Sequence, residues 1–527
     1  MFRIGSNRKA PRGVRAVVAS VAAAATLLSM SGCTAVQHVL DSQQTADPAS
    51  LDLSNVPENL RSYYQQQVEW NDCGGGRECA TITAPMNWDD PTMGDIELAA
   101  TRIPAAGDRQ GSLFTNPGGP GASGYDFVYD GGEDSFSSDL RSAFDIVGWD
   151  PRGVGRSSAV ECYDDAGMDE YFYGVPEKMP KTDEEKIAYA EEQAKKFADA
   201  CKEHTGELLN YVDTMSTVHD LDLLRAVVGD AKLNYFGFSY GTDIGAHYAD
   251  TFPLNVGRMV LDGATDPSLG QFDVVLAQQG AFGDATKAYL EDCLSQAKKC
   301  PFRGNVDQAM KQINRVMEDA DKRKILASDG RQLSSGVIST AINAALYDES
   351  SWEYLTQAFS DYMLQGNPDT FFLLSDFYYG RDETGHYDSN MFEAFMAINC
   401  LDYPVETDPA KIKEYNKKLK EATPIGVDSP EELGDVQCQQ WPYQSRVQPA
   451  KVTAAGAQPI LVVGTTGDPA TPVEWAEAVA SQLESGVLLT YNGEGHIAYD
   501  EGDKCVVGAV DEYLTTGTPP ANGTVCG

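Results

Sequence analysis

One serine in this sequence lies in a setting that favours a nucleophile. Ser239 is the central residue of the pentapeptide GFSYG (237–241), which follows an apolar run at 232–236 and precedes a helical pattern at 242–250. A serine at such a strand-to-helix turn can be held in a strained backbone with its oxygen exposed, and the flanking glycines let strand and helix pass closely. An ordinary tight turn is the alternative, and the flanking elements argue against it. We predict that Ser239 attacks a carbonyl carbon.

A nucleophilic serine needs a histidine base. Of the six histidines, only His386 and His496 lie well downstream of Ser239, and only His496 follows an apolar run, at 486–491. Loops at the carboxyl ends of parallel strands are where ligands meet such sheets. His247 lies on the same helix as the serine, about 12 Å away by helical rise, so packing explains it better. We predict that His496 is the base.

The base in turn needs an orienting carboxylate. Asp468 follows the apolar run 459–463 and lies between the serine and the histidine, in the chain order typical of this arrangement. An Asp-Pro aspartate can also cap a helix or form a turn. Asp262, at the end of an earlier apolar run, is the rival acid, and we prefer Asp468. Thr471 either contacts the triad or caps the helix that Pro472 begins.

Negative charge on the substrate carbonyl oxygen requires preorganised N–H donors. We predict the backbone N–H of Tyr240, next to the nucleophile, as one donor. The other is expected from the glycine-rich loop 117–121, which follows a strand-like run at 112–116. We assign it to Gly119, with Gly118 as the alternative, while a simple Pro-Gly turn is the competing explanation.

The elements that must position these residues alternate between apolar runs and helical patterns, which is typical of a mostly parallel sheet. Strands are expected at 80–84, 96–103, 111–116, 144–149, 232–238, 257–262, 459–463 and 487–491. Between about 270 and 445 the strands stop, and helical periodicity follows Asn305, which is expected to be an N-cap. The sequence therefore predicts a large, mainly helical cap inserted between the serine half and the acid and histidine half. In the turn after the fourth expected strand, Asp150 and Arg152 are expected to pair and support the oxyanion loop.

Five segments resemble a known family. They are NPGGPGASG (116–124), DIVGWDPRGVGRS (145–157), GFSYGT (237–242), GDPATP (467–472) and GEGH (493–496). The chain resembles the secreted tripeptidyl aminopeptidase group of α/β hydrolases, most closely the actinobacterial lipoprotein peptidases with a TAP-like C-terminal region, and more distantly the prolyl iminopeptidases. The resemblance runs from about residue 60 to the end. It implies an α/β-hydrolase fold and a serine peptidase acting near peptide N-termini, without metal or cofactor. Asn116 stands where prolyl iminopeptidases have histidine, which argues against simple proline-iminopeptidase specificity.

An exopeptidase must also bind the terminal ammonium group of its substrate. Asn399-Cys400-Leu401-Asp402, within the expected cap, resembles a segment of the related peptidases. Asp402 is the candidate for the ammonium group, with Asn399 assisting. A surface acid beside a disulfide is the alternative.

The N-terminus reads as an export signal. Residues 1–32 carry five basic and no acidic groups, and the apolar stretch from Ala16 to Met30 is short for a membrane span. It ends in Ser-Gly-Cys33, which resembles a bacterial lipobox, so we expect a lipid on Cys33 and an anchor on the outer face of the cytoplasmic membrane. An ordinary secreted protein is the alternative. We divide the chain into signal peptide 1–32, tether 33–55, hydrolase core 56–270, helical cap 271–444 and TAP-like second core part 445–527.

Charge and cysteine content agree with export. The formal net charge is −39, which disfavours nucleic acid and anionic membrane surfaces. Of eleven cysteines, ten remain once Cys33 is set aside, and none has zinc spacing with histidines. Spacing suggests neighbour pairs, although sequence cannot prove them: Cys73–Cys79, Cys162–Cys201, Cys293–Cys300, Cys400–Cys438 and Cys505–Cys526.

We therefore predict a lipid-anchored, extracytoplasmic serine peptidase whose substrate is a peptide or protein. An esterase or lipase acting on envelope lipids is the first rival, because ester and amide hydrolysis share the triad. A non-catalytic binding lipoprotein is the second rival, and the intact serine, acid, histidine and glycine loop argue against it. The oligomeric state, the side-chain preference and the number of residues removed per cut stay open.

Overall fold

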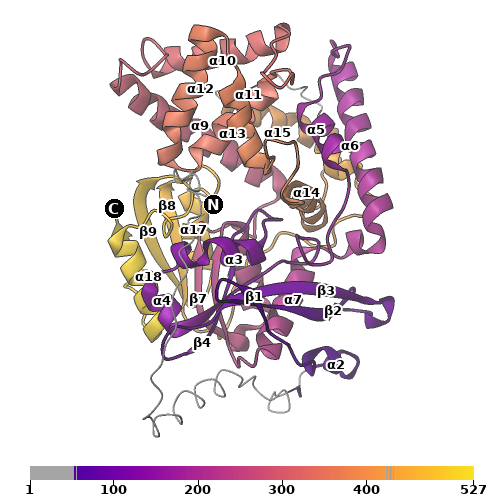
Figure 1. The fold of residues 1–527 in the computed structure, drawn as a ribbon, viewed down its shortest axis with the longest axis vertical. Helices are drawn as coiled ribbons and strands as arrows, with labels where there is room; N and C mark the ends of the chain where they lie inside the picture. Colours follow the sequence, from indigo (N-terminus) through magenta and orange to yellow (C-terminus); the bar gives the residue numbers. More distant parts are fainter. Residues whose placement is uncertain (1–52, 55, 423–424, 427–429, 431–432) are drawn as a thin grey trace, which may run out of the picture.

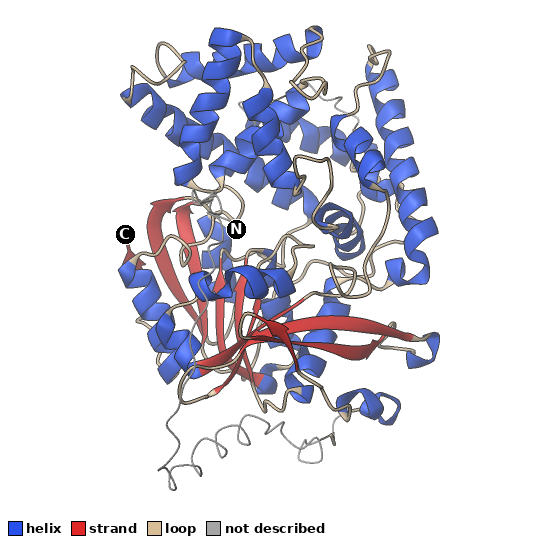
Figure 2. Ribbon diagram, viewed as in Figure 1, coloured by secondary structure: helices blue, strands red, loops and turns tan. Residues whose placement is uncertain are grey.

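A ten-stranded sheet forms the base of the molecule, and a mainly helical cap stands over one end of it (Figures 1 and 2). The computed structural model describes residues 53–54, 56–422, 425–426, 430 and 433–527. The predicted signal peptide 1–32, Cys33 and all but two residues of the tether 33–55 lie outside the described residues. Within the described ranges, no helix combines the length and apolar character needed to cross a membrane.

The sheet has the strand order β1-β2-β3-β5-β4-β6-β7-β8-β9-β10. From β5 to β10 all neighbours are parallel, while β1, β2 and β3 form an antiparallel extension that pairs with β5 through β3. The strand bounds are β1 Asn71–Gly74, β2 Arg77–Pro85, β3 Asp95–Ile103, β4 Gly111–Asn116, β5 Phe144–Trp149, β6 Leu233–Phe238, β7 Val256–Asp262, β8 Ile460–Gly467, β9 Gly486–Glu494 and β10 Thr524–Cys526. All eight expected strands are present. The short strands β1 and β10 lack an apolar run and were not predicted.

The two faces of the sheet are covered by different helices. Because successive side chains of a strand point to opposite faces, Phe236 and Val260 pack into one cluster while their neighbours Tyr235 and Leu261 pack into another. The first cluster includes residues of α3, α4 and α18, and the second includes residues of α7, α8 and α17. The bounds of the core helices are α2 Arg61–Tyr64, α3 Gly124–Ser135, α4 Ser138–Ala143, α7 Thr214–Val227, α8 Tyr240–Thr251, α17 Val473–Gln482 and α18 Lys504–Thr516.

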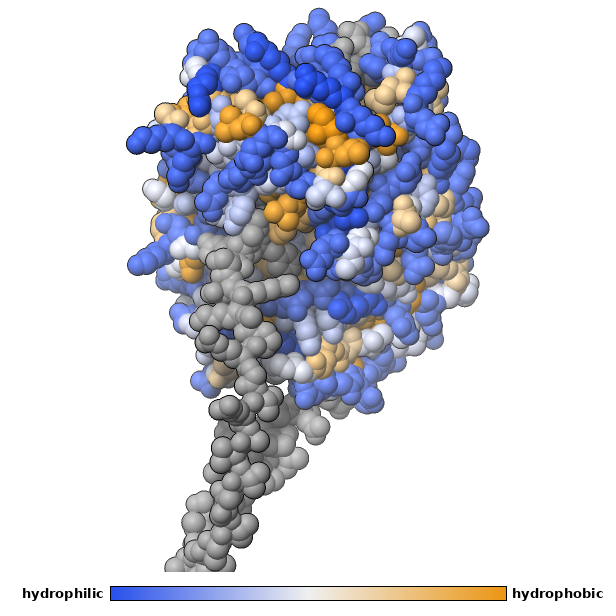
Figure 3. All heavy atoms as spheres, turned by 45° about the horizontal axis from the view of Figure 1, so that its top comes forward, coloured by the Kyte–Doolittle hydropathy of each residue, from blue (hydrophilic) through white to orange (hydrophobic). Residues whose placement is uncertain are grey.

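The cap has a hydrophobic core of its own, formed mainly by α9 to α13. Asn305 caps α10 as expected, through a capping box with Gln308. The face drawn in Figure 3 is mainly hydrophilic, with apolar patches in its upper part, on the cap. The bounds of the helices between β7 and β8 are α9 Gln271–Ser295, α10 Val306–Lys322, α11 Ser335–Leu346, α12 Trp352–Gln365, α13 Asp369–Tyr379, α14 Met391–Asp402, α15 Pro409–Ala422 and α16 Val436–Gln439.

Two helices that precede the nucleophile in sequence also stand against the cap (Figure 1). They are α5 Asp165–Tyr173 and α6 Asp183–Thr205. Phe172 of α5 stacks on Tyr379 of α13 with ring centroids 3.8 Å apart, and α6 packs against α16. The predicted core, residues 56–270, includes this segment. The contacts of α5 and α6 with the cap join residues that are far apart in the sequence. The local periodicity of these two helices therefore does not predict them.

Five disulfides join the ten cysteines of the described part of the chain in the neighbour pairs suggested by their spacing. One of them, Cys400–Cys438, links α14 to α16 within the cap. Another, Cys505–Cys526, links the start of α18 to the last strand. The covalent links thus close loops inside single regions of the fold.

Candidate active site

Ser239 occupies the turn between β6 and α8 with φ 54° and ψ −126°. A non-glycine residue rarely adopts this conformation, and it is the strained turn expected of a nucleophile elbow. The glycines on either side are required by space. A Cβ on Gly237 would lie 2.4 Å from the carbonyl oxygen of Gly241, and one on Gly241 would lie 2.4 Å from that of Asn116.

His496 and Asp468 form a buried pair at the ends of β9 and β8. The imidazole Nδ1 lies 2.8 Å from each carboxylate oxygen. Asp468 also accepts backbone N–H groups from Ala470 and Thr471, at 2.9 and 2.8 Å, which fixes the carboxylate. With Nδ1–H donated to the carboxylate, Nε2 carries the lone pair that a base needs, and Nε2 has no hydrogen-bond partner among the described residues.

Thr471 contacts both members of this pair. Its hydroxyl donates to Asp468 Oδ2 at 2.8 Å and lies 3.2 Å from His496 Nδ1. Thr471 does not cap α17, because Pro472 is the N-cap of that helix and no side chain forms a capping hydrogen bond there. The threonine therefore belongs to the hydrogen-bonded group around the imidazole.

Asp262, the rival acid, contacts the histidine loop but not the imidazole. Its carboxylate accepts the backbone N–H groups of Ala498 and Tyr499 at 3.0 and 2.8 Å, and its carbonyl oxygen accepts the N–H of Ser239 at 3.0 Å. Complete burial raises the pKa of Asp262 to about 7, although the two backbone hydrogen bonds lower it. The residue thus joins the serine turn to the histidine loop.

The glycine-rich loop packs directly on the serine turn. A Cβ on Gly118 would lie 2.8 Å from the Ser239 Cβ and 3.1 Å from the Tyr240 nitrogen, and its φ of 100° also favours glycine. The Gly118 N–H donates to the Asn116 side chain at 3.0 Å. The Gly119 N–H donates to no described residue, and the Tyr240 N–H is the first of α8, where no intrahelical acceptor exists. Gly119 and Tyr240 therefore each offer a backbone N–H group to an oxyanion.

The expected pairing of Asp150 with Arg152 is wrong. Arg152 forms a buried two-pronged ion pair with Asp220, with both N–O distances 2.7 Å. Asp150 instead accepts the Ser123 hydroxyl at 2.5 Å and the Arg156 N–H at 2.7 Å. Pro151 separates the two residues in the turn, and their side chains find separate partners. Asp150 still stabilises the start of α3, which follows the glycine-rich loop.

Asp402 lies near the start of the serine helix α8 and is linked to it through Thr214. Its carboxylate accepts the backbone N–H and the hydroxyl of Thr214 at 2.9 and 2.6 Å, and the same hydroxyl contacts the Tyr240 hydroxyl. Burial raises the pKa of Asp402 well above its usual range, while the Thr214 hydrogen bonds lower it. The Asn399 side chain donates to the Phe395 carbonyl of its own helix at 2.8 Å.

One cap residue beside the histidine was missed from the sequence. The Tyr347 carbonyl accepts the His496 N–H at 2.9 Å, and the Tyr347 ring lies edge-to-face with the imidazole at 5.4 Å. Tyr347 is the C-cap of α11, and no local pattern distinguishes it from other aromatic residues of the cap. The remaining candidates are occupied elsewhere, with His386 paired to Asp165 in the cap and His247 lying 3.6 Å from an aspartate of its own helix.

Comparison with known proteins identifies the family. Residues 112–298 match the α/β hydrolase fold, and residues 427–526 match the TAP-like protein family. The chain is 36% identical over 484 residues to the serine protease Hip1 of Mycobacterium tuberculosis, covering 88% of this chain and 91% of Hip1. It is 33% identical over 480 residues to carboxylesterase B of the same species, covering 87% and 90% of the two chains. It is 29% identical over 480 residues to the tripeptidyl aminopeptidase of Streptomyces lividans, covering 87% and 86%. The chain is therefore a serine hydrolase that belongs to the α/β hydrolases with a TAP-like C-terminal region.

Proposed function

We propose that the chain is an extracytoplasmic serine peptidase that hydrolyses peptide bonds near free N-termini. The observation that carries the proposal is the geometry around His496. Both oxygens of Asp468 hold its Nδ1, and Nε2 is left without a partner among the described residues, at the sheet end where the strained Ser239 stands. This is the arrangement that activates a serine hydroxyl.

In the proposed reaction, the Ser239 hydroxyl attacks the scissile carbonyl carbon while His496 Nε2 takes its proton. The oxyanion accepts hydrogen bonds from the Tyr240 and Gly119 N–H groups. Collapse of this intermediate transfers the proton from His496 to the leaving amine and leaves the acyl group on Ser239. Water, activated by the same Nε2, then hydrolyses the ester and restores the serine. Asp468 stabilises the imidazolium throughout, with Thr471 holding the carboxylate in place.

The preference for free N-termini rests on the cap. Helix α14 places Asp402, with Asn399 one turn earlier, beside the start of the serine helix, and the cap stands over the end of the sheet where the nucleophile lies. A buried carboxylate there is suited to a substrate ammonium group, because a cation stabilises its charged form. Relatives named serine protease and tripeptidyl aminopeptidase support the peptidase assignment.

The extracytoplasmic location is proposed from residues 1–32 and Cys33, which have the pattern of a lipoprotein signal, so the membrane is reached through the lipid on Cys33. Five disulfides in the described part of the chain support an oxidising compartment. Hydrolysis of envelope esters is the second candidate, favoured by the relative named carboxylesterase B.

A matched substrate set separates these functions. It comprises a tripeptide amide with a free amino group, the same amide with an acetylated amino group, and a short acyl ester, each tested on wild type and Ser239→Ala. The proposal expects faster hydrolysis of the free amine and loss of that activity in the variant. Equal cleavage of the blocked amide contradicts the N-terminal preference, and turnover of the ester alone favours the esterase. Asp402→Asn is expected to raise KM for the free-amine substrate and to leave KM for the blocked one unchanged.

A further inference from the structure

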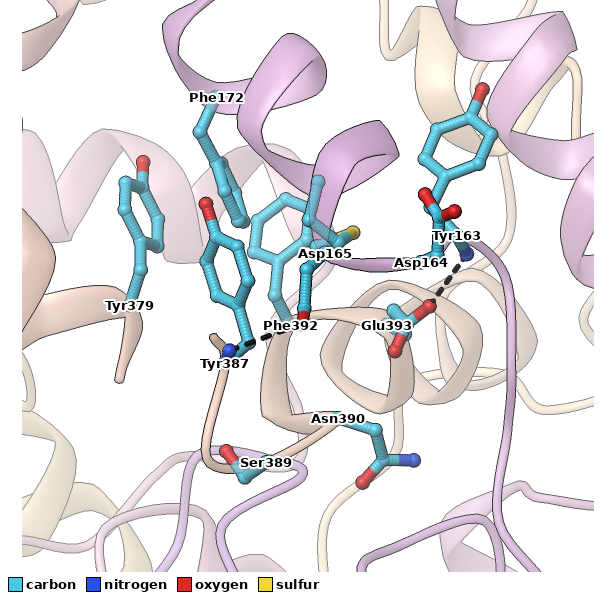
Figure 4. Close-up of a pocket in the computed structure, with 11 residues that line it drawn as sticks. Tyr163, Asp164, Asp165, Phe172, Tyr379, Tyr387, Ser389, Asn390, Phe392 and Glu393 are labelled. Carbon is cyan, nitrogen blue, oxygen red and sulfur yellow. Dashed lines mark hydrogen bonds between the residues drawn. The ribbon is translucent and has the colours of Figure 1, made fainter. Parts of the chain in front are cut away.

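The cap contains a cavity that the proposed reaction does not use. It has a volume of about 320 Å³ and lies between the start of α5, the segment that precedes α14, and α14 itself (Figure 4). This volume is at the lower end of the range of small-molecule sites, about 300 to 1,000 Å³. The lining residues combine aromatic rings with acidic and neutral polar groups: Tyr163, Asp164, Asp165, Met168, Phe172, Tyr379, Tyr387, Ser389, Asn390, Phe392 and Glu393.

Aromatic rings from three elements form one wall of the cavity. Phe172 of α5 stacks on Tyr379 at 3.8 Å between centroids and meets Phe392 of α14 edge-to-face at 4.7 Å. The Tyr387 ring lies 5.8 Å from the Phe172 ring, and its hydroxyl is held by Asp169 at 2.9 Å. These contacts fix the rings in place, so the wall is formed before any ligand arrives.

The lining also contains a carboxylate oxygen that has no hydrogen-bond partner among the described residues. Glu393 is only 7% exposed. Its Oε1 accepts the backbone N–H groups of Cys162 and Tyr163 at 2.7 and 3.0 Å, whereas Oε2 receives no hydrogen bond from any described residue. Burial raises the pKa of Glu393, although its two backbone hydrogen bonds and the nearby His204 lower it. Asp164, which caps α5, and Asp165, which is paired with His386, add two exposed carboxylates to the lining.

The chemistry of the lining selects a cation. No lysine or arginine is among the lining residues, so an anionic ligand would have no charge partner there. Aromatic faces and carboxylates together are the groups that bind ammonium and guanidinium ions. We propose that this cavity binds the ammonium or guanidinium group of a basic side chain in the substrate peptide. The proposal rests on the proposed function only in taking the ligand to be part of a substrate.

The cavity is separate from the catalytic residues but lies near the glycine-rich loop. A Cβ on Gly121, in the glycine-rich loop, would lie 2.3 Å from the Met391 carbonyl and 3.2 Å from the Ala394 Cβ, so the first turn of α14 packs on that loop. Phe392 and Glu393, on the same turn, line the cavity. A helix is about 10 to 12 Å across with its side chains, so one peptide chain can reach both places. The cavity would thus act as an exosite, a second contact for the substrate away from the cleaved bond.

Binding is tested first on the full chain carrying Ser239→Ala, so that hydrolysis plays no part. Calorimetry compares Nα-acetylarginine amide with Nα-acetylcitrulline amide, which has nearly the same shape without the charge. We expect arginine to bind at least about tenfold more tightly, the size of effect that a charged hydrogen bond supports. Glu393→Gln keeps an acceptor for the two backbone N–H groups and is expected to remove most of this difference. Glu161→Gln, an exposed neighbour outside the lining, is the control and is expected to leave it intact.

Asp164→Ser provides a second variant, because serine still caps α5 while the charge is lost. It is expected to weaken arginine binding as well. Equal affinity for arginine and citrulline, or a Glu393→Gln protein that binds like the Glu161→Gln control, would overturn the proposal. This outcome is independent of whether the chain is a peptidase, because only binding is measured.

A kinetic comparison then distinguishes a substrate side chain from a free cation. Two free-amino decapeptides differ only in arginine or citrulline at a position distant from the cleaved bond. The exosite predicts a lower KM for the arginine peptide in the wild type, loss of that difference in Glu393→Gln, and no effect of this variant on a tripeptide amide. Identical KM values for the two decapeptides across a series of arginine positions would contradict a substrate role and leave a site for free cations.

Discussion

Three oxygen atoms lie within hydrogen-bond distance of Nδ1 of His496. Two belong to Asp468 and the third to the Thr471 hydroxyl, which donates to the same carboxylate. Thr471→Val removes a hydrogen bond to a buried charge and is expected to lower kcat by about tenfold to a hundredfold, with little change in KM. Thr471→Ser keeps the hydroxyl and serves as the control. A valine variant with wild-type kcat would show that Asp468 alone orients the imidazole.

Asp262 is expected to make stability depend on pH. Because its pKa rises from an ordinary 3.8 to about 7, the folded chain holds a proton that the unfolded chain releases between these values. The free energy of unfolding should therefore fall as pH rises through this window, by up to about 1.4 kcal/mol per pH unit from this group. Urea unfolding at several pH values measures the slope. Asp262→Asn should flatten it, and an unchanged slope in that variant would contradict the assignment.

The residues that we propose for the chemistry could be selected from the sequence, whereas residues that only pack against them could not. Ser239, Asp468 and His496 stand out because acyl transfer demands their types, their order along the chain and a strand before each one. Tyr347 does not stand out, since its contact with the histidine loop depends on how the cap sits on the sheet. For the same reason, the sequence shows Asp150 beside Arg152 but contains no sign of the distant Asp220.

The close packing of strand β4 against helix α8 at the serine turn requires glycine at position 241. A Cβ on Gly241 would meet the Asn116 carbonyl at 2.4 Å, and backbone atoms there cannot move aside cheaply. Gly241→Ala is expected to destabilise the protein by about 1 to 3 kcal/mol and to lower activity as strand β4 and helix α8 separate. Chemical unfolding and kcat measure the two effects.

Gly280 is a matched control for that variant, because it also lies in a helix, α9, and a Cβ there would meet nothing within 4 Å. Gly280→Ala should be neutral or stabilising by up to about 1 kcal/mol, since alanine favours helices. Equal effects of the two substitutions would mean that helix propensity, rather than the close approach of two elements, explains the effect of Gly241→Ala.

The sheet was easier to predict than the cap. Buried parallel strands are continuous apolar runs, so the strands that carry the site could be located from the sequence. The cap helices α10 and α11 were visible through their periodicity, but the packing of α5 and α6 against the cap was not. Those contacts join aromatic residues more than 200 positions apart, such as Phe172 and Phe392, and local patterns do not contain them.

At the scale of the whole molecule, charge works against compactness. The chain has 79 acidic and 40 basic side chains, which give a formal net charge of −39. The excess carboxylates repel one another, and salt screens that repulsion. We expect Tm to rise between 10 mM and 150 mM sodium chloride at pH 7. Sodium sulfate at equal ionic strength separates screening from the stronger burial that sulfate favours. A Tm that is constant or falls with sodium chloride would show that local ion pairs outweigh the net repulsion.

The whole fold also explains how distant residues meet. The serine follows β6, the acid and histidine follow β8 and β9, and these strands lie side by side through β7 although the cap separates them in sequence. The site therefore exists only when the parallel strands are in register and the cap rests on the histidine loop.

The most direct measurement is covalent labelling with a fluorophosphonate, followed by mass spectrometry of peptides. We predict a single adduct on the peptide that contains Ser239, no adduct in Ser239→Ala, and labelling slowed by at least about a hundredfold in His496→Ala, as expected when a general base is lost. An adduct on another residue, or a labelling rate that does not depend on His496, would contradict the assignment of Ser239 as the activated nucleophile.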